Sequence, residues 1–229
     1  MVFEFYGCPG CGKSTVVKAT EQILKEAGIG YLNYYDVYYD GNNSAMHRLL
    51  NYFKSVFNPS SCALNLHIVR TCMDLKCPFK YAVYLMTMCK RIKDENSRSK
   101  NTLILLDEGV IQFITSLSHG KEISTYESVV SLINHIIDAG ITLKAVECVL
   151  PLNENIKRLT GREQTSRFLD VGEDDELKKL LVEKKKNLDF VASFYEKSIT
   201  LNMSEDPKKN AKLVSDLILT TLSKSHNYD

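Results

Sequence analysis

The sequence lacks several features that would point to a membrane, a nucleic acid or an extracellular environment. No apolar run is long enough to span a bilayer. The 29 Lys and Arg residues are balanced by 28 Asp and Glu residues, so the net charge is only +1. That balance argues against a broad nucleic-acid-binding face. There is no internal repeat and no low-complexity segment, and the first expected strand begins at residue 2, so we expect no signal peptide and a cytoplasmic protein.

The strongest motif is a glycine-rich loop at residues 7–15. It reads Gly7-Cys8-Pro9-Gly10-Cys11-Gly12-Lys13-Ser14-Thr15 and fits the P-loop pattern G-x-x-x-x-G-K-[ST]. A short apolar strand at Val2–Tyr6 precedes the loop, and a pattern of helical spacing follows it up to Gly28. Glycines let the backbone wrap around a polyphosphate, whose charge is favoured at a helix N-terminus. The motif therefore predicts that residues 7–15 bind ATP, with Lys13 on the β- and γ-phosphates and Ser14 on Mg²⁺.

The cysteines do not indicate a disulfide framework or a zinc site. Seven is an odd number in a chain without a secretory signal, and the cysteines between residues 62 and 89 lack paired C-x-x-C spacing. Cys8 and Cys11 do form a C-x-x-C, which leaves a redox switch as an alternative. We favour the interpretation that both occupy variable positions of the P-loop.

Strands alternate with helical patterns along the chain, which predicts an α/β protein with a parallel sheet covered on both faces. We expect residues 1–229 to form one domain. Further strands are expected at 30–35, 103–106, 143–150 and 199–202, and a long charged helix at 173–197. Residues 40–100 are too many for a simple crossover and are interpreted as a helical insertion over one end of the sheet.

Two acidic residues follow the strand at 103–106. Asp107 comes after four apolar residues, the Walker B arrangement, and is expected to hold Mg²⁺ next to Ser14. Glu108 has three open roles: it could orient a water in an ATPase, contact the acceptor in a kinase, or cap the following turn.

Candidates for the acceptor side follow from the strand ends and the insertion. Asp36 is expected to end the second strand, where a carboxylate could take the proton of an acceptor hydroxyl. The alternative is a structural Asx-turn before Tyr38. Arg70 lies in the insertion and, like His47 and Arg48, could bind an anionic acceptor.

Three arginines follow Pro151 at spacings of four and five: Arg158, Arg162 and Arg167. Guanidinium groups stabilise the negative charge that spreads over a transferring phosphoryl group. A segment that closes over ATP would also exclude water. We expect Arg162 and Arg167 to be catalytic, whereas Arg158 has the strongest case for a structural role.

With these residues the sequence resembles the P-loop nucleoside and nucleotide kinases, the thymidylate kinases most of all. The resemblance implies a three-layer P-loop NTPase fold with five parallel strands in the order 2-3-1-4-5. It also implies an arginine-rich lid at 153–172 that includes Arg158, and an adenine-binding loop from Asn202 to Pro207. The stretch from Asp36 to Tyr39 looks like the Asp-x-Phe-Tyr of uridine kinases, in which the aspartate serves the acceptor hydroxyl.

One departure bears on the acceptor. Thymidylate kinases have an arginine after the Walker B aspartate, where this chain has Glu108. A nucleoside, a sugar or another neutral alcohol is therefore at least as good an expectation as a nucleotide. We predict a magnesium- and ATP-dependent small-molecule kinase, a homodimer without nucleic-acid or membrane partners. The alternatives are an ATPase that uses Glu108 and a scaffold that only binds nucleotide; no N-K-x-D motif supports a GTPase.

Overall fold

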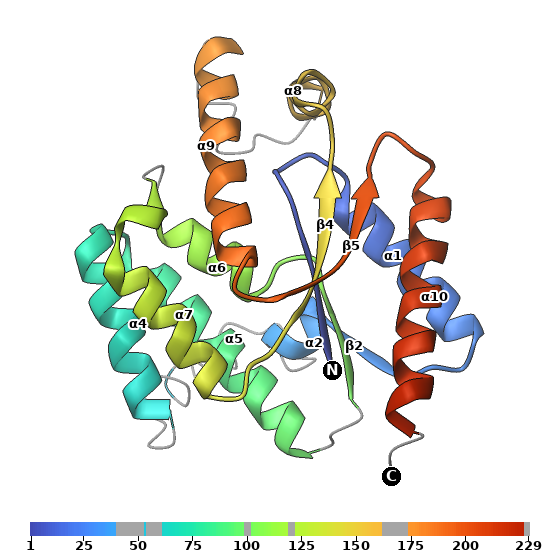
Figure 1. The fold of residues 1–229 in the computed structure, drawn as a ribbon, viewed down its shortest axis with the longest axis horizontal. Helices are drawn as coiled ribbons and strands as arrows, with labels where there is room; N and C mark the ends of the chain where they lie inside the picture. Colours follow the sequence, from blue (N-terminus) through green and yellow to red (C-terminus); the bar gives the residue numbers. More distant parts are fainter. Residues whose placement is uncertain (40–52, 54–60, 99–101, 119–121, 162–173, 227–229) are drawn as a thin grey trace.

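The computed structural model describes residues 1–39, 53, 61–98, 102–118, 122–161 and 174–226. Five parallel strands form one sheet in the order β2-β3-β1-β4-β5, as Figure 1 shows. The strands are β1 (Val2–Tyr6), β2 (Tyr31–Asn33), β3 (Leu103–Leu106), β4 (Lys144–Val149) and β5 (Glu196–Asn202). The α/β class and the strand order implied by the resemblance are thus confirmed.

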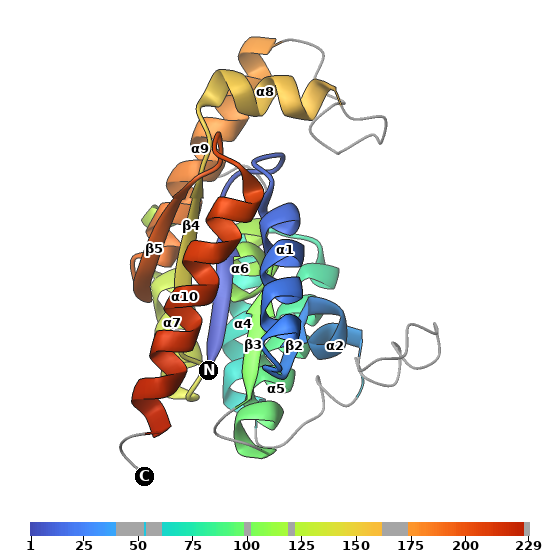
Figure 2. The ribbon, with the colours of Figure 1, turned by 90° about the vertical axis from the view of Figure 1, so that its right-hand side faces the viewer.

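Helices cover both faces of the sheet, which gives the three layers that lie side by side in Figure 1. Helices α1 (Lys13–Glu26) and α10 (Pro207–His226) pack together on one face, and their layer faces the viewer in Figure 2. The other face carries α2 (Tyr34–Tyr39), α4 (Cys62–Leu75), α5 (Phe79–Arg98), α6 (Val110–Leu117), η2 (Ile123–Thr125) and α7 (Glu127–Asp138). Above the carboxyl ends of the strands lie α8 (Leu152–Thr160) and the first part of α9 (Asp174–Ala192).

The central strand distributes its side chains between the two hydrophobic layers. Phe3 and Phe5 face the α1 and α10 layer, whereas Val2 and Tyr6 face the larger helical layer. All four are buried. Because neighbouring side chains of a strand point to opposite faces, a strand covered on both sides needs an uninterrupted apolar run. Val2–Tyr6 has such a run, except at the buried Glu4.

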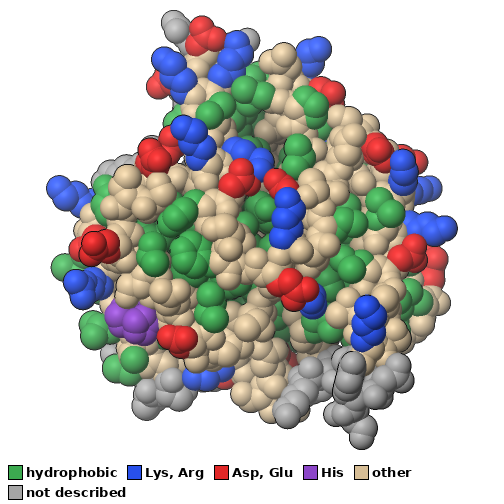
Figure 3. Space-filling view, in the orientation of Figure 1, with side chains coloured by type: hydrophobic (Ala, Val, Ile, Leu, Met, Phe, Trp, Pro, Cys, Tyr) green, Lys and Arg blue, Asp and Glu red, His purple; other side chains and the backbone are tan. Residues whose placement is uncertain are grey.

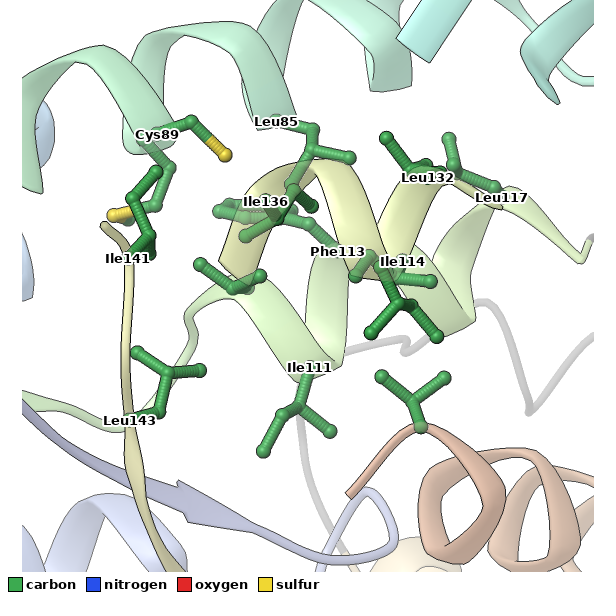
Figure 4. Packing of buried hydrophobic residues seen from close by; sticks show 14 of the residues in the cluster. Leu85, Cys89, Ile111, Phe113, Ile114, Leu117, Leu132, Ile136, Ile141 and Leu143 are labelled. Atoms are coloured by element: carbon green, nitrogen blue, oxygen red, sulfur yellow. The ribbon is translucent and has the colours of Figure 1, made fainter. Parts of the chain in front are cut away.

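Figure 4 shows the core of the larger layer, in which side chains of α5, α6 and α7 meet, and α6 packs against α5 and α9. Ile111, Ile114 and Leu117 have no exposed surface. The sequence analysis assigned no element to residues 110–117, although the apolar residues there recur at a spacing of three and thus signal a helix. This helix matters for the site because it starts directly after the Walker B segment.

The second strand is shorter than expected. The prediction was a strand over residues 30–35, but β2 ends at Asn33 and Asp36 lies in α2. The aromatic residues there fit a strand pattern as well as a helix. In the structure Tyr38 is buried, with its ring 6.0 Å from that of Tyr84 and 6.1 Å from that of Phe113. That tertiary packing stabilises the helical conformation of this segment.

The long charged helix is also shorter than expected, because α9 ends at Ala192 and β5 already begins at Glu196. Lys197 and Glu196 therefore belong to an edge strand, where each pairs with a residue of β4: Glu196 with Lys144, and Lys197 with Glu147. Such cross-strand partners cannot be recognised in the local sequence. Of the insertion expected at 40–100, α4 and α5 are described, while residues 40–52 and 54–60 lie outside the described residues. Within the described ranges, no helix is both long and apolar enough to cross a bilayer.

Candidate active site

The loop between β1 and α1 has the backbone that phosphate binding requires. Gly10 has φ +84°, and a Cβ there would lie 2.7 Å from Leu159 of α8. At Gly7 a Cβ would lie 2.4 Å from the carbonyl oxygen of Cys148. Both positions therefore exclude any side chain. Gly12 precedes α1, whose first turn contains no acidic residue, so its free N–H groups and dipole favour an anion.

Lys13 lies over the loop from which it comes. Its ammonium group donates to the carbonyl oxygens of Gly7 at 2.9 Å and Cys8 at 3.3 Å. A lysine that rests on backbone carbonyls can turn to a phosphate without breaking an ion pair. The geometry agrees with the predicted contact to the β- and γ-phosphates.

Ser14 and Asp107 meet across the sheet, although 93 residues separate them. The Ser14 hydroxyl donates to a carboxylate oxygen of Asp107 at 2.7 Å. A hydroxyl, a carboxylate, waters and substrate phosphates form the oxygen ligand set that Mg²⁺ prefers. The two side chains therefore fit the predicted magnesium site: Ser14 and Asp107 would hold the ion, which would supply charge neutralisation for the phosphates.

Glu21 is an acidic residue of this site that the sequence analysis missed. Burial and the charge of Asp107 raise the pKa of Glu21, Asn33 lowers it by a hydrogen bond, and the charge of Asp36 raises it. Glu21 thus lies within electrostatic range of both aspartates. The sequence could have indicated Glu21, because this residue lies seven residues after Ser14, two turns along the same face of α1.

Asp36 lies on this side of the sheet but in another local structure than expected. Its carboxylate accepts the N–H of Asn33 at 3.0 Å, and the Asn33 side chain accepts the N–H groups of Tyr35 at 2.9 Å and Asp36 at 3.1 Å. This reciprocal arrangement is a capping box. The Asp36 side chain is exposed, so its second oxygen is accessible to an acceptor.

Glu108 follows Asp107 and borders the P-loop. Partial burial and the neighbouring Asp107 carboxylate raise the pKa of Glu108, whereas the charges of Lys13 and Lys184 lower it. Glu108 is therefore within range of the group that should meet the γ-phosphate. Both proposed uses of this carboxylate, with acceptor or with water, fit that position.

Behind the Walker B segment lies a buried carboxylate, Glu4, that the sequence analysis did not assign. It accepts the N–H groups of Ile111 at 3.1 Å and Gln112 at 3.0 Å, at the start of α6. A Cβ on Gly109 would lie 2.6 Å from a Glu4 oxygen. Glu4 therefore anchors the turn that carries Asp107 and Glu108.

Arg158 connects the P-loop with the loop after β5. Its guanidinium donates to the carbonyl oxygens of Cys11 at 3.2 Å and Met203 at 3.0 Å. Asn202 shapes that second loop: its side chain accepts the Ser204 N–H at 3.1 Å. Arg158 therefore has a structural role beside the expected nucleotide, and its contact with ATP stays a prediction, as does that of Asn202.

The remaining candidates are not joined to this site by the described structure. Arg70 is exposed on α4, and its charge acts on His67, which stacks on His135 of α7. No contact in the described structure connects Arg70 with the P-loop. The catalytic candidates Arg162 and Arg167 lie outside the described residues, as do His47 and Arg48.

The burial of Cys8 and Cys11 bears on the alternative that these cysteines form a redox switch. Cys8 is half-buried and Cys11 is buried, and both are free thiols. Burial raises the pKa of the Cys8 thiol to about 11, with Cys11 adding to the effect and the nearby lysines opposing it. A thiol with this pKa forms little of the thiolate on which redox exchange depends. The simple reading of these cysteines as P-loop residues is the better supported one.

Comparison with solved structures finds this fold in kinases. A deoxyadenosine kinase from M. mycoides with bound dCTP matches with a TM-score of 0.52 and 13% identity, over 96% of this chain and 100% of that chain. The same kinase with bound dATP matches with a TM-score of 0.50 and 15% identity, over 95% and 99%. Thymidylate kinase from Candida albicans matches with a TM-score of 0.50 and 13% identity, over 96% and 91%. No family model and no curated protein matches the sequence. The chain therefore has the fold of the P-loop nucleoside and nucleotide kinases.

Proposed function

We propose that the protein is an ATP-dependent phosphotransferase that moves the γ-phosphoryl group to a hydroxyl or phosphate of a small molecule. The acceptor class comprises nucleosides, nucleotides, sugars and other metabolites. The observation that carries the proposal is the 2.7 Å contact between Ser14 and Asp107 at the mouth of an intact P-loop. A chance glycine-rich turn would not bring a magnesium-binding pair together across the sheet.

In the proposed reaction each side chain has one task. The P-loop N–H groups and Lys13 hold the phosphates, and Ser14 with Asp107 would hold Mg²⁺. The acceptor oxygen forms a bond to the γ-phosphorus while the bond from that phosphorus to the bridging oxygen of ADP breaks. The acceptor proton passes to Asp36, whose carboxylate is exposed and whose charge acts on Glu21.

Glu108 supports a second candidate, an ATPase. Its carboxylate is next to the Walker B aspartate and within range of Lys13, where it could orient a water toward the γ-phosphate. The raised pKa of Glu108 is compatible with this role, because a general base works best when its pKa lies near the working pH.

One assay separates the two candidates. ADP release is measured with Mg²⁺ and ATP alone, and then with a panel of nucleosides, nucleotides and sugars. ADP release that depends on one acceptor supports the kinase. Turnover that no acceptor changes supports the ATPase, and the absence of both would refute the enzyme proposal. The predicted homodimer is tested separately by sedimentation equilibrium.

A further inference from the structure

Helix α9 packs on the P-loop, although the two segments are far apart in the sequence. The thiol of Cys8 lies 3.6 Å from the carbonyl oxygen of Leu181, which is 173 residues away. Leu181 belongs to a small hydrophobic cluster against which Cys8 packs; the other members are Ile156, Leu159 and Leu177. Lys184 lies three residues after Leu181 and therefore on the same face of α9, one turn further.

The charge environment of Lys184 agrees with that placement. Burial, together with the charge of Lys13, lowers the pKa of Lys184 to about 8, while the charges of Cys8 and Glu108 act in the opposite direction. The same pair of lysines lowers the pKa of Glu108. Lys184 is thus in electrostatic range of Glu108 and of Lys13, the residue that is predicted to meet the γ-phosphate.

Lys185 and Lys186, which follow Lys184 in a run of three lysines, lie in different environments. Lys185 donates to Glu147 at 2.9 Å and also pairs with Asp189. Lys186 is exposed to solvent. Figure 3 shows that positive and negative side chains are mixed on the face of the molecule that is seen in Figure 1. Unlike Lys185, Lys184 has an ammonium group that makes no hydrogen bond or ion pair with a described residue.

Two lysines near each other without a paired anion are unfavourable, because like charges repel and burial removes their hydration. Glu108 compensates for only one of the two charges. A terminal phosphate carries enough negative charge to compensate for both, and hydrogen bonds from ammonium groups to phosphate are among the stronger ones.

We propose that Lys184 is a second phosphate-binding lysine, which contacts the γ-phosphoryl group together with Lys13. The inference rests on the proposed function, in which ATP occupies the P-loop. During transfer the Lys184 ammonium donates hydrogen bonds to the γ-phosphoryl oxygens and neither gains nor loses a proton.

The test compares Lys184→Met with Lys186→Met as a matched control on the exposed side of the same helix. Methionine keeps an apolar stem that can pack against the P-loop. Calorimetry with Mg²⁺ measures the affinity for ADP and for the non-hydrolysable β,γ-imido analogue of ATP. We expect Lys184→Met to lose about 10- to 100-fold in affinity for the analogue, the usual range for a charged hydrogen bond. Its affinity for ADP should stay within about twofold, and Lys186→Met should match the wild type for both nucleotides.

Three other outcomes would contradict the proposed role of Lys184, each for a different reason. If the wild type binds the analogue and Lys184→Met binds it equally well, Lys184 has no phosphate contact, while the proposed function stands. If Lys184→Met loses ADP and the analogue to the same extent, the lysine supports the fold and not the γ-phosphoryl group. If the wild type binds neither nucleotide, the proposed function fails and the inference fails with it.

Discussion

Glu4 is a buried carboxylate that should make the stability of this protein depend on pH near neutrality. Its side chain has no exposed surface. Burial raises the pKa of Glu4 from 4.5 to about 7, although hydrogen bonds from N–H groups at the start of α6 act in the opposite direction. Replacement by glutamine keeps one acceptor oxygen for these groups and removes the titration.

The sign of the effect follows from the two pKa values. Between pH 4.5 and about 7 the folded protein keeps a proton that the unfolded chain has already released. The contribution of Glu4 to the free energy of unfolding is therefore fully present below pH 4.5, decreases as the pH rises and is lost above about pH 7. At about 1.4 kcal/mol per pH unit, the whole change is about 3 kcal/mol.

The assay is urea unfolding of the wild type and Glu4→Gln at several pH values across this window. The difference in unfolding free energy, wild type minus variant, should fall by about 3 kcal/mol as the pH rises. Other titrating groups cancel in this difference, and the polar mismatch of the new amide adds only a constant. Equal pH slopes in both proteins would refute the reasoning, because Glu4 would then titrate normally in the folded state.

Glu147 provides a control of opposite sign. Burial acts against it, but hydrogen bonds from Lys185, Lys197 and Thr200 lower the pKa of Glu147 to about 2. Its contribution to stability is therefore present above its ordinary pKa of 4.5 and is lost as the pH falls toward 2. The stability difference between the wild type and Glu147→Gln should accordingly shrink on acidification below pH 4.5. A difference that stays constant there would mean that these hydrogen bonds do not favour the ionised carboxylate.

Three further predictions concern the reaction. Lys13→Ala should abolish phosphoryl transfer while circular dichroism shows an intact fold, since the loss of its charge removes several kcal/mol of transition-state stabilisation; near-normal turnover would contradict the P-loop assignment. Asp36→Asn should lower acceptor phosphorylation by roughly 10²-fold or more and spare ATP binding, whereas Glu108→Gln should mainly change the acceptor KM; the reverse ranking in steady-state kinetics would transfer the base role to Glu108. Arg162→Ala and Arg167→Ala should lower kcat more than they raise the KM for ATP, and an unchanged kcat in both would remove them from the mechanism.

The P-loop and the buried strands could be predicted from the sequence because their determinants are local. Residues 7–15 are contiguous, so the glycines that shape the loop and the lysine that serves it stand in one motif. The strands Val2–Tyr6 and Leu103–Leu106 are continuous apolar runs, and both were predicted with their observed bounds. Asp107 could be assigned because it directly follows one of these runs.

Only the tertiary structure decided what depends on contacts between distant segments. Asp36 lies in a helix whose start has a local signal, the capping box with Asn33, but the packing of Tyr38 on rings of α5 and α6 is not recorded in the local sequence. Helix α9 ends before Lys197 because that residue pairs with Glu147 on the neighbouring strand. Lys184 is one of three consecutive lysines, and only the docking of Leu181 on Cys8 directs it toward Lys13. The sequence by itself thus determined the phosphate-binding loop and the class of fold, because short-range geometry specifies them. The helix packing that surrounds this loop required the fold, because residues far apart in the chain meet there and their mutual burial selects the arrangement.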